Sequence, residues 1–122
     1  FQAGFRNYVG LAGMESSITY LQNLGLDNIR KHIIKLSNLF IDEIGKIPES
    51  KIYVPEDESV RTSIVSFDIG GENPETIVSE LAKKGIIIAK REIMDKPILR
   101  ISPHVFNTEN EILNVIEELK KL

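Results

Sequence analysis

The sequence has 122 residues, enough for one domain that buries roughly two thirds of the surface of its unfolded chain. Its apolar share of 42% and charged share of 27% are ordinary for a globular fold, and its formal net charge is −3. Because nucleic-acid binding depends on clustered Lys and Arg, this acidic balance speaks against a nucleic-acid partner. The chain has no cysteine, so disulfides, a thiolate nucleophile and Cys-based metal sites are excluded.

Other global features set further expectations. His32 and His104 lie far apart in the sequence and do not form a metal-ligand spacing, so we expect no metal. No apolar run approaches the ~20 residues that span a bilayer. We therefore expect no membrane partner and a cytoplasmic location. The chain opens on Phe1 rather than on Met, which indicates a piece of a longer protein.

The first half of the chain predicts two long helices. Apolar residues at three- and four-residue steps over residues 11–24 are typical of a helix with one buried face, which Gly25 ends. A second stripe over residues 29–44 predicts another helix, with Asp27 as its N-cap and Gly45 after its end.

The second half of the chain alternates strands and helices. Strands are predicted over residues 51–54, 62–69, 86–89 and 98–102, with 86–89 buried on both faces and residues 91–97 as a polar connection. Asn73 and Pro74 start one helix, and Thr108 with Glu111 forms a capping box at the start of the last. The predicted fold class is α+β: two long helices, then a small, largely antiparallel sheet with helices on one face.

Arg100 is the most informative single residue. Strand alternation places Arg100 with Ile98 and Ser102 on one face and Leu99 with Ile101 on the other. A guanidinium in an apolar strand is solvated, paired or available to an anionic ligand, and arginine suits two parallel hydrogen bonds to a carboxylate. The strand by itself favours an ordinary solvated charge on an edge strand.

Other polar residues carry weaker signals. Lys90 and Arg91 follow a predicted buried strand, where ligand-facing side chains are common, yet plain surface charge explains them equally well. The Ser102-Pro103-His104 run predicts a structural turn rather than a nucleophile beside a base. Asn107 is expected to bond its own backbone two residues on, and His32 to lie on a solvated helix face.

Two further segments are ambiguous. Gly4, Gly10 and Gly13 precede or open a helix, where free amide protons can bind phosphate, but no strand precedes them as a dinucleotide fingerprint requires. Residues 56–58 are acidic but lack the spacing of a calcium loop, which favours solvated surface.

Two motifs together resemble the C-terminal part of the class V aminotransferases. Residues 1–7 read Phe-Gln-Ala-Gly-Phe-Arg-Asn where that family has Phe-Glu-x-Gly-Thr-x-Asn. The later family pattern of Gly-Ile, an Arg, and Leu-Arg-Ile/Val-Ser-Pro-His-x-Tyr-Asn-Thr-x-x-Glu-Ile is matched by Gly85-Ile86, by Arg91 and by residues 99–112, with Phe106 in place of the tyrosine. The resemblance covers nearly the whole chain.

The resemblance implies a pyridoxal-phosphate (PLP) enzyme acting on an amino acid. In that family the arginine matching Arg100 binds the substrate α-carboxylate, and Arg91 is a second substrate-binding candidate. The residues matching Gly4 and Phe5 reach the cofactor phosphate of the neighbouring subunit of a homodimer. Phe5 lacks the family's hydroxyl, which leaves only its backbone amide.

The resemblance also implies what this chain lacks. The family's Schiff-base lysine lies upstream, so we expect no catalytic residue here and no activity of the chain alone. Residues 1–25 are expected to be an interface helix segment and residues 26–122 the C-terminal small domain. Because residues 90–96 hold no cysteine, a persulfide-forming desulfurase is disfavoured against an epimerase-like or plain aminotransferase branch. The alternatives are a stand-alone small-molecule-binding regulatory module and a dimerisation module.

Overall fold

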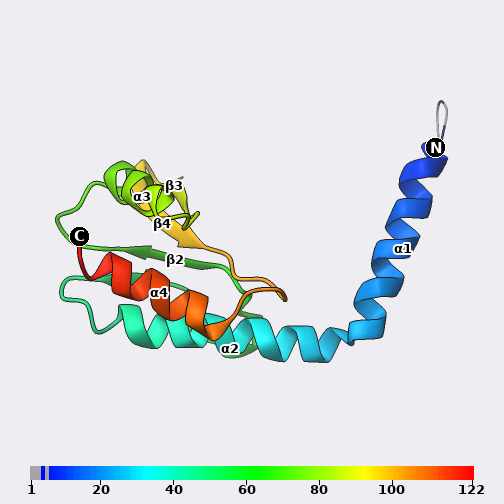
Figure 1. Cartoon of the computed structure of the whole chain (residues 1–122), viewed down its shortest axis with the longest axis horizontal. Coiled ribbons are helices and arrows are strands. Elements are labelled where there is room, and N and C mark those ends of the chain that lie inside the picture. Colours follow the sequence, from blue (N-terminus) through cyan, green and yellow to red (C-terminus); the bar gives the residue numbers. More distant parts are fainter. Residues whose placement is uncertain (1–3, 5) are drawn as a thin grey trace. The chain divides into compact units, whose positions relative to one another are not determined.

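A computed structural model describes residue 4 and residues 6–122 of the chain, which divide into two units, residues 1–31 and 32–122. The elements, labelled in Figure 1, are α1 (Tyr8–Leu24), α2 (Leu26–Ile44), β1 (Lys51–Tyr53), the 3-10 helix η1 (Glu58–Val60), β2 (Val65–Asp68), α3 (Pro74–Lys83), β3 (Ala89–Ile93), β4 (Lys96–Ile101) and α4 (Glu109–Leu119). Within the described part of the chain, no helix is long and apolar enough to cross a membrane.

Helix α1 lies in the first unit and differs from the prediction in two ways. It begins at Tyr8, earlier than expected, because the side chain of Asn7 caps it by accepting a hydrogen bond from the Gly10 amide at 2.8 Å. It ends at Gly25, whose φ of 83° a residue with a side chain rarely adopts. None of its residues is buried, so the predicted buried face has no partner within the described part of this chain.

The second unit is built on a four-stranded sheet in the order β1-β2-β4-β3. All three neighbouring pairs are antiparallel, which confirms the predicted sheet type. The long connection between β2 and β3 contains α3, and β4 leads through a loop to α4. Strand β4 is therefore central, with a neighbour on each side, so the edge position expected for Arg100 was wrong.

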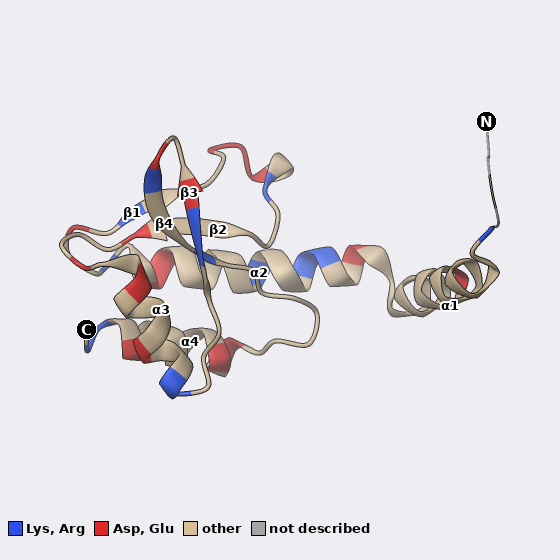
Figure 2. Cartoon of the chain, turned by 90° about the horizontal axis from the view of Figure 1, so that it is seen from above, with Lys and Arg blue, Asp and Glu red and all other residues tan. Residues whose placement is uncertain are grey.

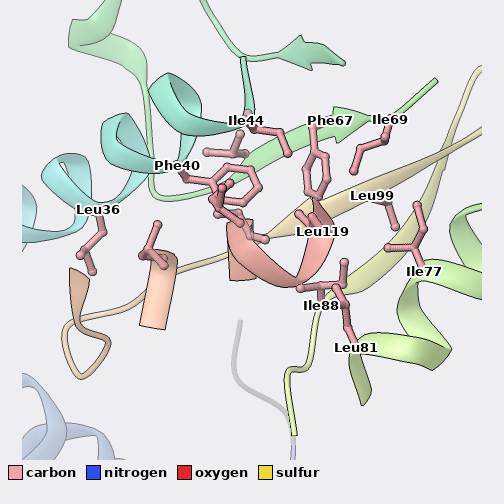
Figure 3. Close-up of a cluster of buried hydrophobic side chains, with 14 residues drawn as sticks. Leu36, Phe40, Ile44, Phe67, Ile69, Ile77, Leu81, Ile88, Leu99 and Leu119 are labelled. Carbon is pink, nitrogen blue, oxygen red and sulfur yellow. The ribbon is translucent and has the colours of Figure 1, made fainter. Parts of the chain in front are cut away.

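One face of the sheet carries the hydrophobic core, which confirms helices on one face. Phe67 of β2 meets Phe40 of α2 edge to face, with ring centroids 5.0 Å apart. Figure 3 shows the cluster, which is drawn from all three helices of this unit and from β2 and β4. It comprises Leu36, Phe40, Ile44, Val65, Phe67, Ile69, Ile77, Leu81, Ile88, Leu99, Ile101, Ile112, Ile116 and Leu119. Each large apolar side chain so buried contributes roughly 1.5–3 kcal/mol.

The region between α3 and β4 departs most from the prediction. The apolar run 86–88 is not a strand, and Ile87 is 82% exposed, so burial on both faces was wrong. Residues 91–97 are not a loose connection either, because β3 and β4 form a tight hairpin. Its turn residues, Met94 and Asp95, both have positive φ (49° and 60°), as a two-residue type I′ turn requires.

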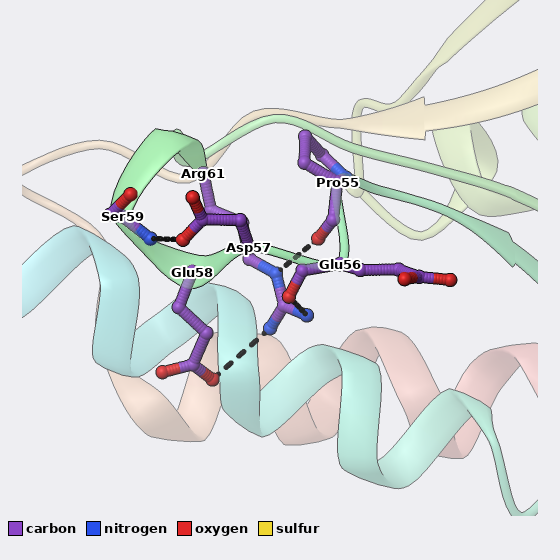
Figure 4. Close-up of polar contacts among 6 residues, drawn as sticks. All are labelled: Pro55, Glu56, Asp57, Glu58, Ser59 and Arg61. Carbon is purple, nitrogen blue, oxygen red and sulfur yellow. Dashed lines mark hydrogen bonds and ion pairs between the residues drawn. The ribbon is translucent and has the colours of Figure 1, made fainter.

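The acidic segment between β1 and β2 is ordered by Arg61 (Figure 4). Its Nε donates to the Pro55 carbonyl at 2.6 Å and its Nη2 to the Glu56 carbonyl at 3.1 Å, while Nη1 pairs with the Glu58 carboxylate at 3.2 Å. Asp57 accepts the Ser59 amide proton at 2.8 Å and starts η1. The role of this loop is structural.

Helix α4 begins with the predicted capping box: Thr108 accepts the Glu111 amide proton while the Glu111 carboxylate accepts that of Thr108. Two ion pairs join α4 to α2. Glu109 at the start of α4 pairs with Lys35, and Lys120 at the end of α4 pairs with Glu43 near the end of α2. These pairings show that the two helices run parallel.

Candidate functional site

The face of the sheet opposite the core carries two of the polar candidates, Arg91 and Arg100. The pairing register places its residues side by side, since alternate residues of each strand share a face. This outer face carries Lys51, Tyr53, Ser66, Asp68, Ala89, Arg91, Ile93, Lys96, Ile98 and Arg100. It therefore bears four cationic side chains and one carboxylate, in a chain whose overall charge is −3.

Arg100 lies at the centre of this face. Its strand neighbours are Ser66 on β2 and Ala89 on β3, both of which have small side chains. Its Nε is buried and has no hydrogen-bond partner among the described residues. An unsatisfied buried donor costs about 1–3 kcal/mol, more when it is charged, so this group calls for an acceptor. Sequence reasoning missed both small neighbours, because only the strand register brings them to Arg100.

Arg91 shares the outer face with Arg100. It pairs with Ile98 on β4, which makes it the diagonal neighbour of Arg100 across the two strands. Its side chain is exposed, and its Nη1 donates to the carbonyl of Lys90 at 2.8 Å. The structure thus brings together the two arginines singled out in the sequence.

Lys90, by contrast, is separated from this group by strand alternation. It pairs with Leu99, whose side chain is in the core, and its Nζ binds the Glu75 carboxylate of α3. The hydrogen bond between them raises the pKa of Lys90 and lowers that of Glu75. Lys90 therefore links β3 to α3 through an exposed ion pair.

A shallow apolar pocket lies on the outer face towards the hairpin. It has a volume of about 370 Å³ and is lined by Tyr53, Ile93, Met94, Lys96 and Ile98. Lys96 donates to Asp68 at 2.7 Å and to the Tyr53 hydroxyl at 3.1 Å. The hydrogen bond to Asp68 is the main cause of the raised pKa of Lys96. The single acid of this face is thus already paired.

The loop after β4 is fixed by hydrogen bonds rather than arranged for catalysis. Asn107 accepts the backbone amide proton of His104 at 2.8 Å, three residues before it, so the predicted bond to its own following backbone was wrong. His32 is half-buried and its Nε2 lies 3.0 Å from the Asn107 carbonyl, so the solvated helix face predicted for it was also wrong. His104 is exposed and its ring contacts that of Phe106.

The N-terminal candidates lie in the other unit. Gly4 has a φ of 95°, and nothing lies within 4 Å of where a side chain would begin. Phe5 lies outside the described residues. Across the described ranges, no group of three or more His, Asp or Glu side chains is placed to hold a metal ion.

Comparison with known proteins then decides the family. The model of the aminotransferase class V family matches residues 1–115. The chain belongs to the class V aminotransferase family. Among curated relatives, a cysteine desulfurase of Wigglesworthia glossinidia brevipalpis is 31% identical over 131 aligned residues, which cover 100% of this chain and 31% of that protein. The chain thus spans about a third of the length of the curated relatives it matches.

Solved structures share the fold of this class V member. An apo cysteine desulfurase from Thermococcus onnurineus NA1 matches with a TM-score of 0.91 at 22% identity, over 99% of this chain and 32% of that one. A K223A variant of C-DES, in which glycine is covalently linked to the PLP cofactor, matches with a TM-score of 0.81 at 20% identity. The latter match covers 100% of this chain and 31% of that chain.

Proposed function

We propose that this chain is the C-terminal part of a PLP-dependent enzyme acting on an amino acid, and that Arg100 binds the substrate α-carboxylate. The observation that carries the proposal is the buried Nε of Arg100, which lacks a partner among the described residues. Strand pairing places Arg100 between the small residues Ser66 and Ala89. A carboxylate accepting from the guanidinium edge would satisfy it with two charge-assisted hydrogen bonds.

The position of Arg100 supports a role in orientation. Its strand is held on both sides by the sheet, so the guanidinium is presented from a fixed backbone. Holding the carboxylate would fix which bond at the substrate Cα faces the cofactor, and correct positioning lowers the barrier of a bound reaction. When bound, PLP supplies the electron sink for breaking that bond.

Two residues of the N-terminal segment are candidates for binding the cofactor phosphate. The positive φ and uncrowded surroundings of Gly4 allow its backbone to approach a phosphate closely. We propose that Gly4 and the backbone amide of Phe5 serve the cofactor phosphate of a partner subunit in a homodimer. Residues 1–25 then form an interface segment and residues 26–122 the small domain. The chain alone is expected to be inactive.

The reaction branch is also a proposal. The curated relative is a cysteine desulfurase, whereas the β3–β4 hairpin of this chain is tight and holds no cysteine. We propose a reaction other than desulfuration through a protein persulfide. After incubation with cysteine, the full-length protein should carry no persulfide, which mass spectrometry detects as an added sulfur atom. A persulfide on the full-length protein would refute this proposal.

The test of the carboxylate role compares Arg100→Gln with Lys51→Gln in the full-length protein. Loss of a charged hydrogen-bond pair worth about 1.5–3 kcal/mol should raise the KM of Arg100→Gln roughly 10- to 100-fold. Lys51 lies on the same face of β1, so Lys51→Gln removes an equal charge without touching the site and should keep its KM. An unchanged KM in Arg100→Gln would refute the proposal.

A further inference from the structure

Arg91 and Arg100 form a block with two apolar residues on the outer face. The pairs Arg91–Ile98 and Ala89–Arg100 place the two guanidinium-bearing residues on one diagonal and the two apolar residues on the other. Diagonal neighbours across antiparallel strands are roughly 7–8 Å apart, within reach of long side chains. Figure 2 shows the basic colour on β3 next to β4.

Neither arginine of this block is neutralised by a carboxylate in the described part of the chain. Arg100 has an unpartnered Nε, and the contact found for Arg91 is with a backbone carbonyl. The acids nearby are engaged elsewhere: Asp68 binds Lys96 and Glu75 binds Lys90. Glu92 follows Arg91 but points to the other face, because side chains alternate along β3.

Two adjacent positive charges without a counter-ion repel each other, and this repulsion is relieved by an anion that reaches both. A ligand with a single carboxylate can satisfy the buried Nε of Arg100 but leaves Arg91 unpaired. A ligand with two acidic groups can pair with both guanidinium groups, each through charge-assisted hydrogen bonds.

We infer that the substrate of this protein is an amino acid whose side chain ends in a second anionic group, with Arg100 holding the α-carboxylate and Arg91 the side-chain anion. The inference rests on the proposed function, since it takes Arg100 as the site of the α-carboxylate. It adds that Arg91 determines which side chain is preferred.

Titration with acetate and with succinate tests the carboxylate role of Arg100 separately from the role of Arg91 in binding a second anionic group. Each is titrated into the full-length protein, and the Nε–Hε NMR signals of Arg91 and Arg100 are followed. Succinate should shift both signals and bind at least five-fold more tightly than acetate, which should shift that of Arg100 alone. Arg91→Gln should reduce succinate affinity to the acetate level and leave acetate binding unchanged. Lys51→Gln, which removes a charge elsewhere on the same face, should keep the preference for succinate.

Any other result contradicts either the carboxylate role of Arg100 or the role of Arg91. If acetate shifts Arg100 but succinate binds no more tightly, the dianionic substrate is ruled out and the carboxylate role of Arg100 stands. If neither ion shifts Arg100, the proposed function itself fails. An equal loss of succinate affinity in Lys51→Gln and Arg91→Gln would mean that the face attracts anions through its overall charge, and would overturn the role of Arg91.

Discussion

At the scale of single residues, the pattern of alternation in the sequence was sufficient to place Arg100 on the face opposite Leu99 and Ile101. It was insufficient to identify its surroundings. Ser66 and Ala89 reach Arg100 through strand pairing across the sheet, and no local signal specifies which strands pair. The same limit explains His32, whose partner is the carbonyl of Asn107 in a loop that is distant in the sequence.

The cap of α4 gives a prediction at the scale of one residue. Thr108→Ala removes the hydroxyl that accepts the Glu111 amide proton at 3.3 Å. Loss of such a cap should lower the free energy of unfolding by about 1 kcal/mol. Urea unfolding followed by circular dichroism measures it, with Thr76→Ala as a control because Thr76 is exposed and the N-cap of its helix, α3, is Asn73. Equal losses in the two variants would show that the cap contributes nothing specific.

At the scale of elements, the sequence predicted helices better than strands. Asn73 with Pro74 and the capping box of α4 are local signals, and both helices begin where those signals lie. The β3–β4 hairpin was missed because its turn is Met-Asp rather than Asn-Gly, and because the apolar run 86–88 resembles a buried strand. The observed strand boundaries also differ from the predicted ones, because a strand ends where its pairing partner ends, and the local composition does not reveal that partner.

The hairpin turn gives a prediction at the scale of an element. Met94 is 97% exposed and has a φ of 49°, a conformation that costs a residue such as Met about 1 kcal/mol relative to Asn or Gly. Met94→Asn should therefore stabilise the fold by up to about 1 kcal/mol and raise Tm by a few degrees. Met94→Leu, which keeps the conformational cost, should leave Tm near its original value. A Tm that rises equally in both variants would refute this explanation.

At the scale of the whole molecule, the periodicity and order of the predicted elements gave the α+β fold class correctly, because apolar periodicity reports which faces are buried. It cannot report what buries them. The stripe of α1 has the spacing of a core helix, yet Leu11, Met14 and Ile18 are each about half exposed in this chain. The resemblance to the family was visible in two motifs and not in the periodicity. The family model matches residues 1–115.

The dependence of folding stability on acidic pH gives a prediction for the whole molecule. Five carboxylates have pKa values lowered by hydrogen bonds that they accept: Glu43, Asp57, Glu75, Glu111 and Glu118. A carboxylate whose pKa is lower in the folded chain stabilises the fold above its unfolded pKa and loses this effect as the pH falls through its folded value. Stability should thus be level from pH 7 to about 5 and fall below about pH 4.

Urea midpoints at pH 7, 5, 4 and 3 measure this profile. The acid slope should be smaller in Glu111→Gln, because that side chain can still accept the Thr108 amide proton but no longer titrates. Lys90, Lys96 and Lys121 have raised pKa values, so their contribution is retained through neutral pH and is lost only above about pH 10. Equal midpoints from pH 5 to pH 3 would contradict the assignment of these carboxylates.

The central place of β4 has a consequence for how the two arginines behave in time. Amide protons of a strand paired on both sides exchange with solvent only when a large part of the sheet opens, whereas an edge strand opens locally. Arg100 therefore stands on a preorganised backbone that a ligand cannot reshape, while Arg91 stands on the edge strand β3. Under the roles proposed above, Arg100 would be a rigid anchor and Arg91 an adjustable contact, so that ligands of different length would share a single fixed end.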